Sequence, residues 1–230
     1  MIVKTIGNVI KIGYSGKRLG NVNPRFGADG DANFAKFKAQ FPGYRIYDLP
    51  ATGKDSIVEV DDLTPEQVFE SGVDGLITKD VHSLLVLRAA DCIPVVFYVP
   101  GQKILGLAHI GTSGAALHLP RKMVGAMGTP ADLHIYVGPH ISRKSYRFEP
   151  DKFEKKLDQS WDKYIGHEAD GVHIDLLNYV LDELKAAGVK TDNIQLSPVD
   201  TGADPGYFSH RRHKLTGEPD GRNCFAVCLV

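Results

Sequence analysis

Two apolar runs on either side of a Pro-Gly dipeptide constrain the fold of this chain more than any other feature. The runs are Ile93–Val99 and Lys103–Ala108, and the dipeptide at residues 100–101 suits the centre of a tight turn. We predict that the two runs form an antiparallel hairpin. In a register that is symmetric about the turn, Cys92 and His109 lie directly opposite each other, with their Cβ atoms roughly 4.5–5.5 Å apart.

The rest of the chain alternates between helical and extended patterns. The clearest helix is Asp175–Ala187, whose apolar side chains form one stripe and which stops at Gly188. Because predicted strands occur both as hairpin partners and between helices, we predict an α+β fold. No change in composition marks a boundary, so we expect one domain over residues 1–230. The other predicted helices are Ala32–Phe41, Pro65–Ser71, Gly114–Met127 and Asp151–Trp161, and the other predicted strands are Ser56–Val60, Leu84–Leu87, Leu133–Val137, Asn193–Leu196 and Phe225–Leu229.

Composition argues against several classes of protein. The 27 basic and 28 acidic residues leave a net charge of −1, unlike a nucleic-acid-binding protein or a polybasic membrane protein. The three cysteines are too few for a disulfide framework, as expected in a reducing compartment. The N-terminal segment has no apolar signal-peptide core, and the apolar runs are too short to span a membrane. We therefore predict a cytoplasmic protein that binds neither nucleic acid nor membrane.

The Cys92–His109 pair is the candidate reactive or metal-binding site of the predicted hairpin. Its spacing suits a shared metal ion, or a thiolate beside an imidazolium. Asp91 adds a carboxylate next to the cysteine. Pro94 cannot donate a backbone hydrogen bond, so the strand is predicted to be an edge strand or to bulge near Cys92. The competing interpretation is a buried structural cysteine beside a core histidine whose hydrogen bonds are satisfied.

Two further groups of residues are candidates for binding. The basic cluster at residues 210–213 (His-Arg-Arg-His) can receive a phosphate or a carboxylate, because arginine offers paired donors; the alternative is a solvated basic loop. His140 follows the predicted strand Leu133–Val137, and a surface histidine is the competing interpretation there. Cys224 and Cys228 lie on one face of the last predicted strand, about 13 Å apart, which is too far for a disulfide or a shared metal. We therefore predict that both are core residues.

Five segments of the chain match motifs that occur together in one protein family. They are Ala90–Val95, which resembles T-A-D-C-x-P-V/I/L, Ala108–Gly111 (H-A-G-W-R-G), Val137–Ile141 (G-P-x-I), Tyr146–Glu149 (C-Y/F-E-V) and Tyr207–Arg222 (F-F-S-Y-R-R-D-x-x-T-G-R). In these motifs and their order the chain resembles the YfiH-like family. Its members are labelled multicopper polyphenol oxidases or laccase-domain proteins, are described as purine nucleoside phosphorylases, and carry the alternative name peptidoglycan editing factor. The resemblance extends from about Gly53 to Val230 and is thin before Gly53.

This resemblance implies both a fold and a metal site. The fold is a single α+β domain of packed mixed β-sheets flanked by helices. The family site holds zinc, rather than copper, through one cysteine and two histidines. Cys92 and His109 match two of these ligands, but Thr52 stands where the other histidine is expected, and a hydroxyl is a poor zinc ligand. Either His140 supplies the third ligand, or zinc binding is weak or absent.

The resemblance also implies roles for other residues. Asp91 is expected to orient His109 or to take a proton. Arg211 and Arg212 are expected to hold phosphate. Asn33 matches the asparagine of an N-R pair in the family and is a candidate substrate contact. The family's Trp-Arg pair after the histidine motif is replaced by threonine and serine at residues 112–113.

The function implied is that of a zinc-dependent enzyme acting on adenosine or inosine. It is expected to be a purine nucleoside phosphorylase or a deaminase, weakened by the missing ligand, with a nucleoside and phosphate as its partners. Two alternatives stay open. One is a metal-free hydrolase or transferase in which Cys92 attacks a carbonyl and His109 takes its proton. The other is a non-catalytic binding homologue. The sequence leaves the nucleobase, the acceptor (phosphate or water) and the oligomeric state open.

Overall fold

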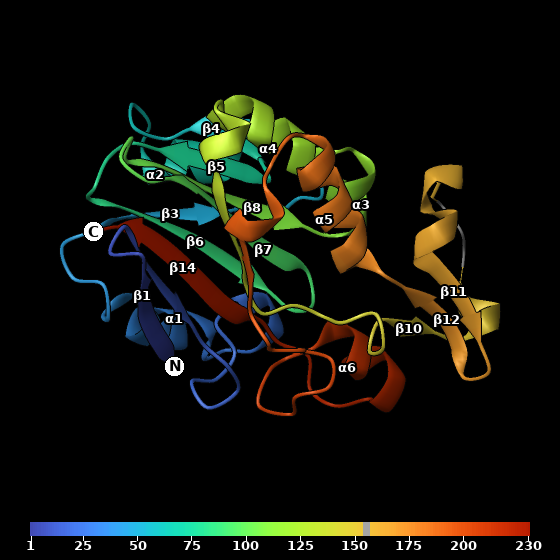
Figure 1. The fold of residues 1–230 in the computed structure, drawn as a ribbon. Helices are drawn as coiled ribbons and strands as arrows, with labels where there is room; N and C mark the ends of the chain where they lie inside the picture. Colours follow the sequence, from blue (N-terminus) through green and yellow to red (C-terminus); the bar gives the residue numbers. More distant parts are fainter. Residues whose placement is uncertain (154–156) are drawn as a thin grey trace.

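Two large β-sheets packed face to face form the body of the protein (Figure 1). The computed structural model describes residues 1–153 and 157–230. The five-stranded sheet has the order β1 (Ile2–Ile6), β2 (Ile10–Tyr14), β14 (Asn223–Leu229), β6 (Ser83–Ala89) and β3 (Arg45–Leu49). The six-stranded sheet has the order β13 (Ile194–Leu196), β9 (His134–Val137), β7 (Ile93–Val99), β8 (Ile104–Ile110), β5 (Gly75–Thr78) and β4 (Ile57–Glu59). Both sheets are mixed, because β3, β4 and β13 each pair in parallel with a neighbour.

Helices cover the two outer faces of this pair of sheets (Figure 1). Helix α1 (Gly30–Lys38) packs through its phenylalanines on the five-stranded sheet. The six-stranded sheet is covered by α3 (Thr112–Ala116), α4 (Leu119–Met127) and α5 (Leu176–Ala186). The remaining helices are α2 (Pro65–Ser71), α6 (His210–Thr216) and the 3-10 helices η1 (Pro24–Phe26), η2 (Pro130–Asp132), η3 (Pro150–Lys152), η4 (Gln159–Tyr164) and η5 (Thr191–Asn193).

Strand β7 contributes side chains to two hydrophobic clusters, one on each face of its sheet. Val95 and Phe97 belong to the cluster beneath the helices, whereas Val96 and Tyr98 belong to the cluster between the sheets. Successive side chains of a strand point to opposite faces, so a strand covered on both sides reads as a continuous apolar run. This burial explains why residues 93–99 contain no charged side chain.

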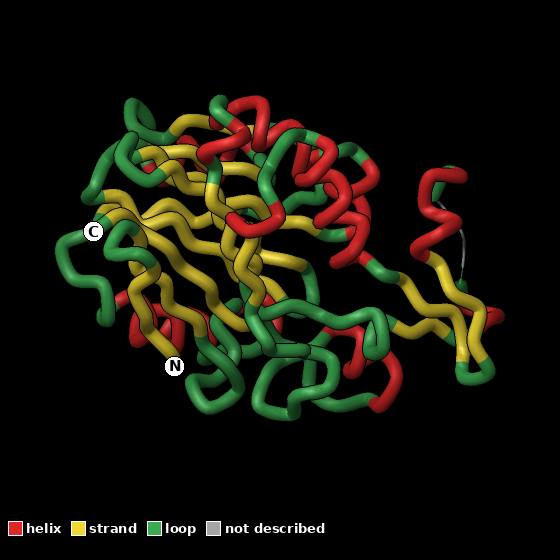
Figure 2. Tube along the Cα trace, in the orientation of Figure 1, coloured by secondary structure: helices red, strands yellow, loops and turns green. Residues whose placement is uncertain are grey.

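A small third sheet forms an arm that projects from the body beyond α5 (Figure 2). It contains β10 (Arg147–Phe148), β12 (Gly171–Ile174) and β11 (Ile165–Glu168) in that order. The indole of Trp161 in η4 stacks on the ring of Tyr179 in α5, with the ring centroids 3.8 Å apart. This stacking attaches the arm to the body.

Several predictions about the fold are confirmed. The class is α+β, and the helix predicted over residues 175–187 is α5, with Asp175 as its N-cap. Helix α2 occupies its predicted span and begins with a capping box at Thr64. The predicted helix over residues 114–127 is broken into α3 and α4, because His118 takes a left-handed conformation directly before Leu119 and Pro120. No helix in the described ranges is long and apolar enough to cross a bilayer.

Three predictions are wrong. The charged helix over residues 151–161 is replaced by the ends of η3 and η4, and residues 154–156 of that span lie outside the described part. The hairpin turn contains four residues, 100–103, so Val99 pairs with Ile104 and Pro94 pairs with His109. Strand β7 is central rather than an edge, since it pairs with both β8 and β9; the proline is tolerated as its second residue, where its carbonyl accepts from Gly138 N.

Candidate active site

A cavity of about 300 Å³ lies where the start of β7 meets the end of β8. We call it the Cys92–His109 cavity. Its walls come from parts of the chain that are far apart in the sequence. They are the loop at residues 51–53, residues 90–92, His109, residues 111–113, Ile141, Tyr146, Leu176, His210 and Arg211.

Cys92 and His109 both line this cavity, although the predicted register was wrong. A shift of two residues keeps every side chain on its face of the sheet, so the pair still faces one space. Gly111 now stands level with Cys92. A Cβ atom on Gly111 would lie only 3.1 Å from Cys92 Sγ and 3.9 Å from His109 Cε1. Glycine at this position therefore leaves room for the Cys92 side chain.

The imidazole of His109 is held in a strongly charged environment. Its Nδ1 lies 2.7 Å from Asp74 Oδ1. Burial opposes the charged ring, but the negative charge of Cys92 and the hydrogen bonds to Asp74 and Cys92 outweigh it and raise the pKa of His109 to about 10. The ring therefore carries its proton at neutral pH, and a metal ion bound by the same groups would have to displace that proton.

Asp74 is the site residue that the sequence analysis missed. Its side chain is fully buried directly before β5. Burial raises its pKa, but the hydrogen bonds from His109 and from the amides of Lys54 and Gly53 outweigh burial and hold the pKa below its usual value. The sequence offers only an aspartate between Val73 and Gly75 at the start of an apolar segment. No local pattern connects this aspartate to a histidine 35 residues away.

Asp91 does not orient His109 as we expected. It lies on the cavity wall with a left-handed backbone conformation, at φ 83°. Its Oδ1 accepts from Thr201 Oγ1 at 2.9 Å, and its Oδ2 accepts from the amide of Arg211 at 2.6 Å. Asp91 thus holds the start of α6 against the loop that precedes Cys92.

The two adjacent arginines of α6 have different environments. The guanidinium of Arg211 lines the cavity and stacks on Phe148, 3.7 Å from the ring centroid. Its Nε is buried and has no hydrogen-bond partner among the described residues. Burial lowers the pKa of this group despite the nearby Tyr146 and Asp91. Because Arg211 lines the cavity and arginine offers several N–H donors, this residue is a candidate for holding an anion there.

Arg212, by contrast, is fully engaged by the protein. Its guanidinium donates to the carbonyls of Thr201, Gly202, Asp204 and Tyr207 and to Glu218 Oε1. The predicted phosphate contact is therefore wrong for Arg212. From the sequence alone, Arg212 could not be distinguished from Arg211, because both belong to the same basic cluster.

Asn33 is also not at the cavity. Its Nδ2 donates to the carbonyl of Asn21 at 3.0 Å, and its Oδ1 accepts from Lys36 Nζ at 3.2 Å. It is buried in α1, on the far side of the five-stranded sheet. We therefore withdraw Asn33 as a substrate contact.

The structure does not bring His140 to the Cys92–His109 pair. His140 is buried, its Nδ1 donates to the carbonyl of Gly138 at 2.7 Å, and it is not one of the residues that line the cavity. Burial lowers its pKa. Thr52 does lie at the cavity, at the position where the family histidine is expected. Its hydroxyl is within hydrogen-bonding distance of the Gly72 carbonyl (2.7 Å) and of Asp74 Oδ2 (2.9 Å).

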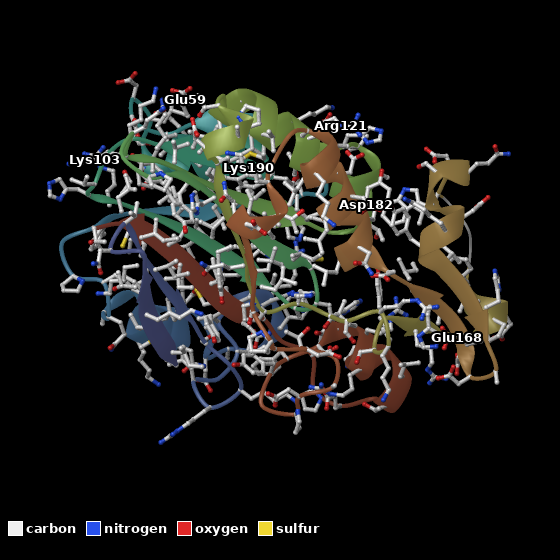
Figure 3. All side chains as sticks on the ribbon, viewed as in Figure 1. Glu59, Lys103, Arg121, Glu168, Asp182 and Lys190 are labelled. Carbon is white, nitrogen blue, oxygen red and sulfur yellow. The ribbon has the colours of Figure 1, made fainter. Side chains whose placement is uncertain are left out.

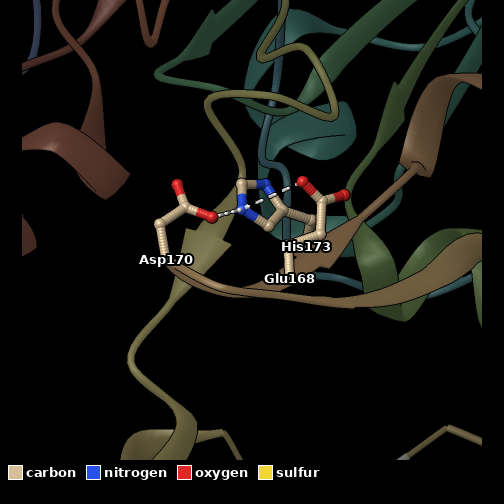
Figure 4. Close-up of side chains that lie close together, drawn as sticks. All are labelled: Glu168, Asp170 and His173. Carbon is tan, nitrogen blue, oxygen red and sulfur yellow. Dashed lines mark hydrogen bonds and ion pairs between the residues drawn. The ribbon is translucent and has the colours of Figure 1, made fainter.

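Among the described residues, zinc would therefore find only two converging ligands in this cavity. His210 also lines it, but its Nδ1 is paired with Asp220 and it forms no three-ligand group with Cys92 and His109. A thiolate and an imidazole suit zinc, but structural and catalytic zinc sites use at least three protein ligands. In the described part of the chain, three candidate ligand atoms lie within 4.8 Å of one another only at Glu168, Asp170 and His173, on the arm (Figure 4; Figure 3 labels Glu168). These side chains are already paired, since His173 Nε2 lies 3.0 Å from Asp170 Oδ1. The cavity matches the family's zinc ligands in part and does not complete the set.

Comparison with known proteins identifies the family. The family model described as multi-copper polyphenol oxidoreductase laccase matches residues 31–229. A purine nucleoside phosphorylase of Staphylococcus epidermidis is 32% identical over 186 residues, which cover 77% of this chain and 67% of the relative. Purine nucleoside phosphorylase YlmD of Geobacillus stearothermophilus is 32% identical over 155 residues, which cover 63% of this chain and 57% of that relative.

Solved structures show the same fold. The crystal structure of the hypothetical protein YfiH from Bacillus licheniformis has a TM-score of 0.79 and 25% identity, covering 96% of this chain and 93% of that chain. YlmD from Geobacillus stearothermophilus has a TM-score of 0.77 at 24% identity, covering 97% and 92%. As the five motifs predicted, the chain belongs to the multi-copper polyphenol oxidoreductase laccase family of YfiH-like proteins.

Proposed function

We propose that this protein is a purine nucleoside phosphorylase with low turnover. The observation that carries the proposal is the Cys92–His109 cavity of about 300 Å³, which is lined by a histidine with a raised pKa, a cysteine and an arginine. That volume is within the range of small-molecule sites. The relatives named purine nucleoside phosphorylase support this class of reaction.

The chain's own residues can assist phosphorolysis in two ways. In this reaction the bond from ribose C1′ to the purine nitrogen breaks, and a phosphate oxygen bonds to C1′. The purine leaves with the electron pair and takes up a proton, which His109 can donate from Nε2 because Asp74 occupies Nδ1. Arg211 can hold the phosphate. Zinc, when bound, would act as a Lewis acid.

The phosphate role is tested by Arg211→Gln. We expect the Kd for phosphate to rise about 10- to 100-fold, because a hydrogen bond to a charged group is worth about 1.5–3 kcal/mol. Isothermal titration with phosphate measures this even if turnover is slow. Lys214→Gln, an exposed position on the same helix, is the matched control. Equal phosphate affinity in wild type and in Arg211→Gln would contradict the assignment.

The missing ligand is tested by Thr52→His. We expect the wild-type protein to bind zinc weakly and to turn over inosine and adenosine slowly, because a neutral hydroxyl does not replace an imidazole. The variant should gain zinc and phosphorolysis together. Zinc content by mass spectrometry and release of free purine and ribose 1-phosphate measure the two properties. Tight zinc binding by wild type would show that another group completes the site, and zinc without activity would implicate residues 112–113.

A second function is favoured by one observation that the sequence did not supply. Asp74, His109 and Cys92 form an acid–histidine–thiol series, in which the acid orients the base beside a nucleophile. Such a series suits a metal-free hydrolase or transferase. The products separate the candidates, because phosphorolysis releases free purine whereas an acyl-transfer enzyme accumulates a covalent adduct on Cys92. Nucleoside binding with neither product would indicate the non-catalytic homologue.

A further inference from the structure

We propose that Asp74 is the positioning residue of this site: it keeps a proton on His109 Nδ1 and so presents Nε2 to the cavity. The two residues lie on neighbouring strands, since Gly75 at the start of β5 pairs with Ala108 in β8. Their backbones are also joined, because His109 N donates to the Asp74 carbonyl at 2.9 Å. The strand pairing and this backbone hydrogen bond therefore hold the two side chains next to each other.

The carboxylate of Asp74 faces hydrogen-bond donors on both oxygens. Oδ2 accepts from the amides of Thr52 at 3.0 Å and Lys54 at 2.8 Å. Oδ1 accepts from the amide of Gly53 at 3.0 Å and faces His109 Nδ1 at 2.7 Å. An ionised carboxylate is an acceptor only. Nδ1 must therefore carry a proton, and Nε2 is the nitrogen left for chemistry or for a metal.

The same carboxylate also builds part of the cavity wall. Its three amide donors are consecutive residues of the loop at 52–54, and Thr52 and Gly53 line the cavity. Gly53 adopts φ 77°, a conformation that glycine accepts without strain. One buried group thus sets both the ring of His109 and the wall beside it. Its effect on turnover rests on the proposed function, but its effect on the ring does not.

Asp74→Asn tests the inference because the two oxygens have different neighbours. Two amides converge on the Oδ2 position and one, that of Gly53, on the Oδ1 position. We therefore expect the asparagine oxygen to occupy the Oδ2 position and the NH₂ group to face His109. An NH₂ group is a donor, so Nδ1 must give up its proton and accept. We expect the ¹⁵N resonance of Nδ1, recorded at pH 7 on histidine-labelled protein, to move from the protonated to the unprotonated range.

A matched control is available at the mouth of the same cavity. His210 Nδ1 lies 3.0 Å from Asp220 Oδ2, so Asp220→Asn removes a carboxylate from a different histidine. It should leave the His109 resonance unchanged. An unprotonated Nδ1 in the wild-type spectrum, or a proton that persists on Nδ1 in Asp74→Asn, would overturn the inference. The wild-type spectrum alone decides the question if Asp74→Asn does not fold.

Kinetics supply the second readout. If the proposed function holds, kcat should fall about 10²- to 10⁴-fold in Asp74→Asn, because the wrong nitrogen then carries the proton. The Kd for phosphate should stay within about twofold, since Arg211 is unchanged. An equal loss of phosphate affinity would mean that Asp74 acts only by supporting the fold. If the wild type shows no turnover, the proposed function fails while the spectra still test the inference.

Discussion

Cys92→Ser is expected to lower purine nucleoside turnover by roughly 10²- to 10⁴-fold and to abolish the remaining zinc binding, because the variant loses the sulfur ligand beside His109. The cavity should otherwise persist, since the two side chains differ by one atom. Phosphate-dependent release of purine measures the first effect, and metal content measures the second. Retention of full turnover would exclude Cys92 from the chemistry.

Cys228→Ser is the matched control for this variant. Cys228 is fully buried in β14, and its Sγ lies 3.8 Å from the Lys11 carbonyl, which can accept from a serine hydroxyl. Burial raises the pKa of both Cys224 and Cys228, whereas Cys92 is partly exposed at the cavity. Native protein should therefore take up a single iodoacetamide adduct, and Cys92→Ser should take up none.

Arg212→Met is expected to be the most destabilising of the variants considered. The change removes the donors to four backbone carbonyls between residues 201 and 207 and the ion pair with Glu218. We expect a loss of about 2–4 kcal/mol in the free energy of unfolding. This corresponds to a fall in Tm of about 4–16 °C for a chain of this size.

The contrast with exposed positions makes this prediction specific. Lys214→Met, on the same helix but exposed, should change Tm by little. Differential scanning calorimetry on both variants decides the matter. A Tm for Arg212→Met within about 1 °C of wild type would show that the loop does not depend on the guanidinium.

Much of the fold follows from local patterns in the sequence. The apolar stripe of α5, the cap at Thr64 and the break at Pro120 are all set by residues within a few positions of one another. The hairpin of β7 and β8 was also predictable, because its two apolar runs and the turn between them are adjacent in the sequence. Its register, however, depends on the number of residues in the turn. Gly101 at φ 86° and Lys103 at φ 50° allow a four-residue turn, and no pattern in the strands distinguishes it from the two-residue turn that we expected.

Only the site residues that lie in sequence motifs could be predicted. Cys92 and His109 flank the hairpin, so local pairing brings them together. Asp74 reaches them through the pairing of β5 with β8. No local sequence pattern predicts that pairing. Arg211 and Arg212 are adjacent residues of the same type, so the sequence does not distinguish them. Only the folded structure shows that Arg211 lines the cavity while Arg212 binds backbone carbonyls.

The hydrogen bonds of Asp91 have a consequence for the order of folding. This carboxylate joins Thr201 and the Arg211 amide, 110 and 120 positions away along the chain. Contacts of such separation form only after the entropy of closing long loops has been overcome, which is slow in sheet-rich proteins. The Cys92–His109 cavity is therefore complete only when these distant segments have come together, and recovery of phosphate binding should report their assembly during refolding.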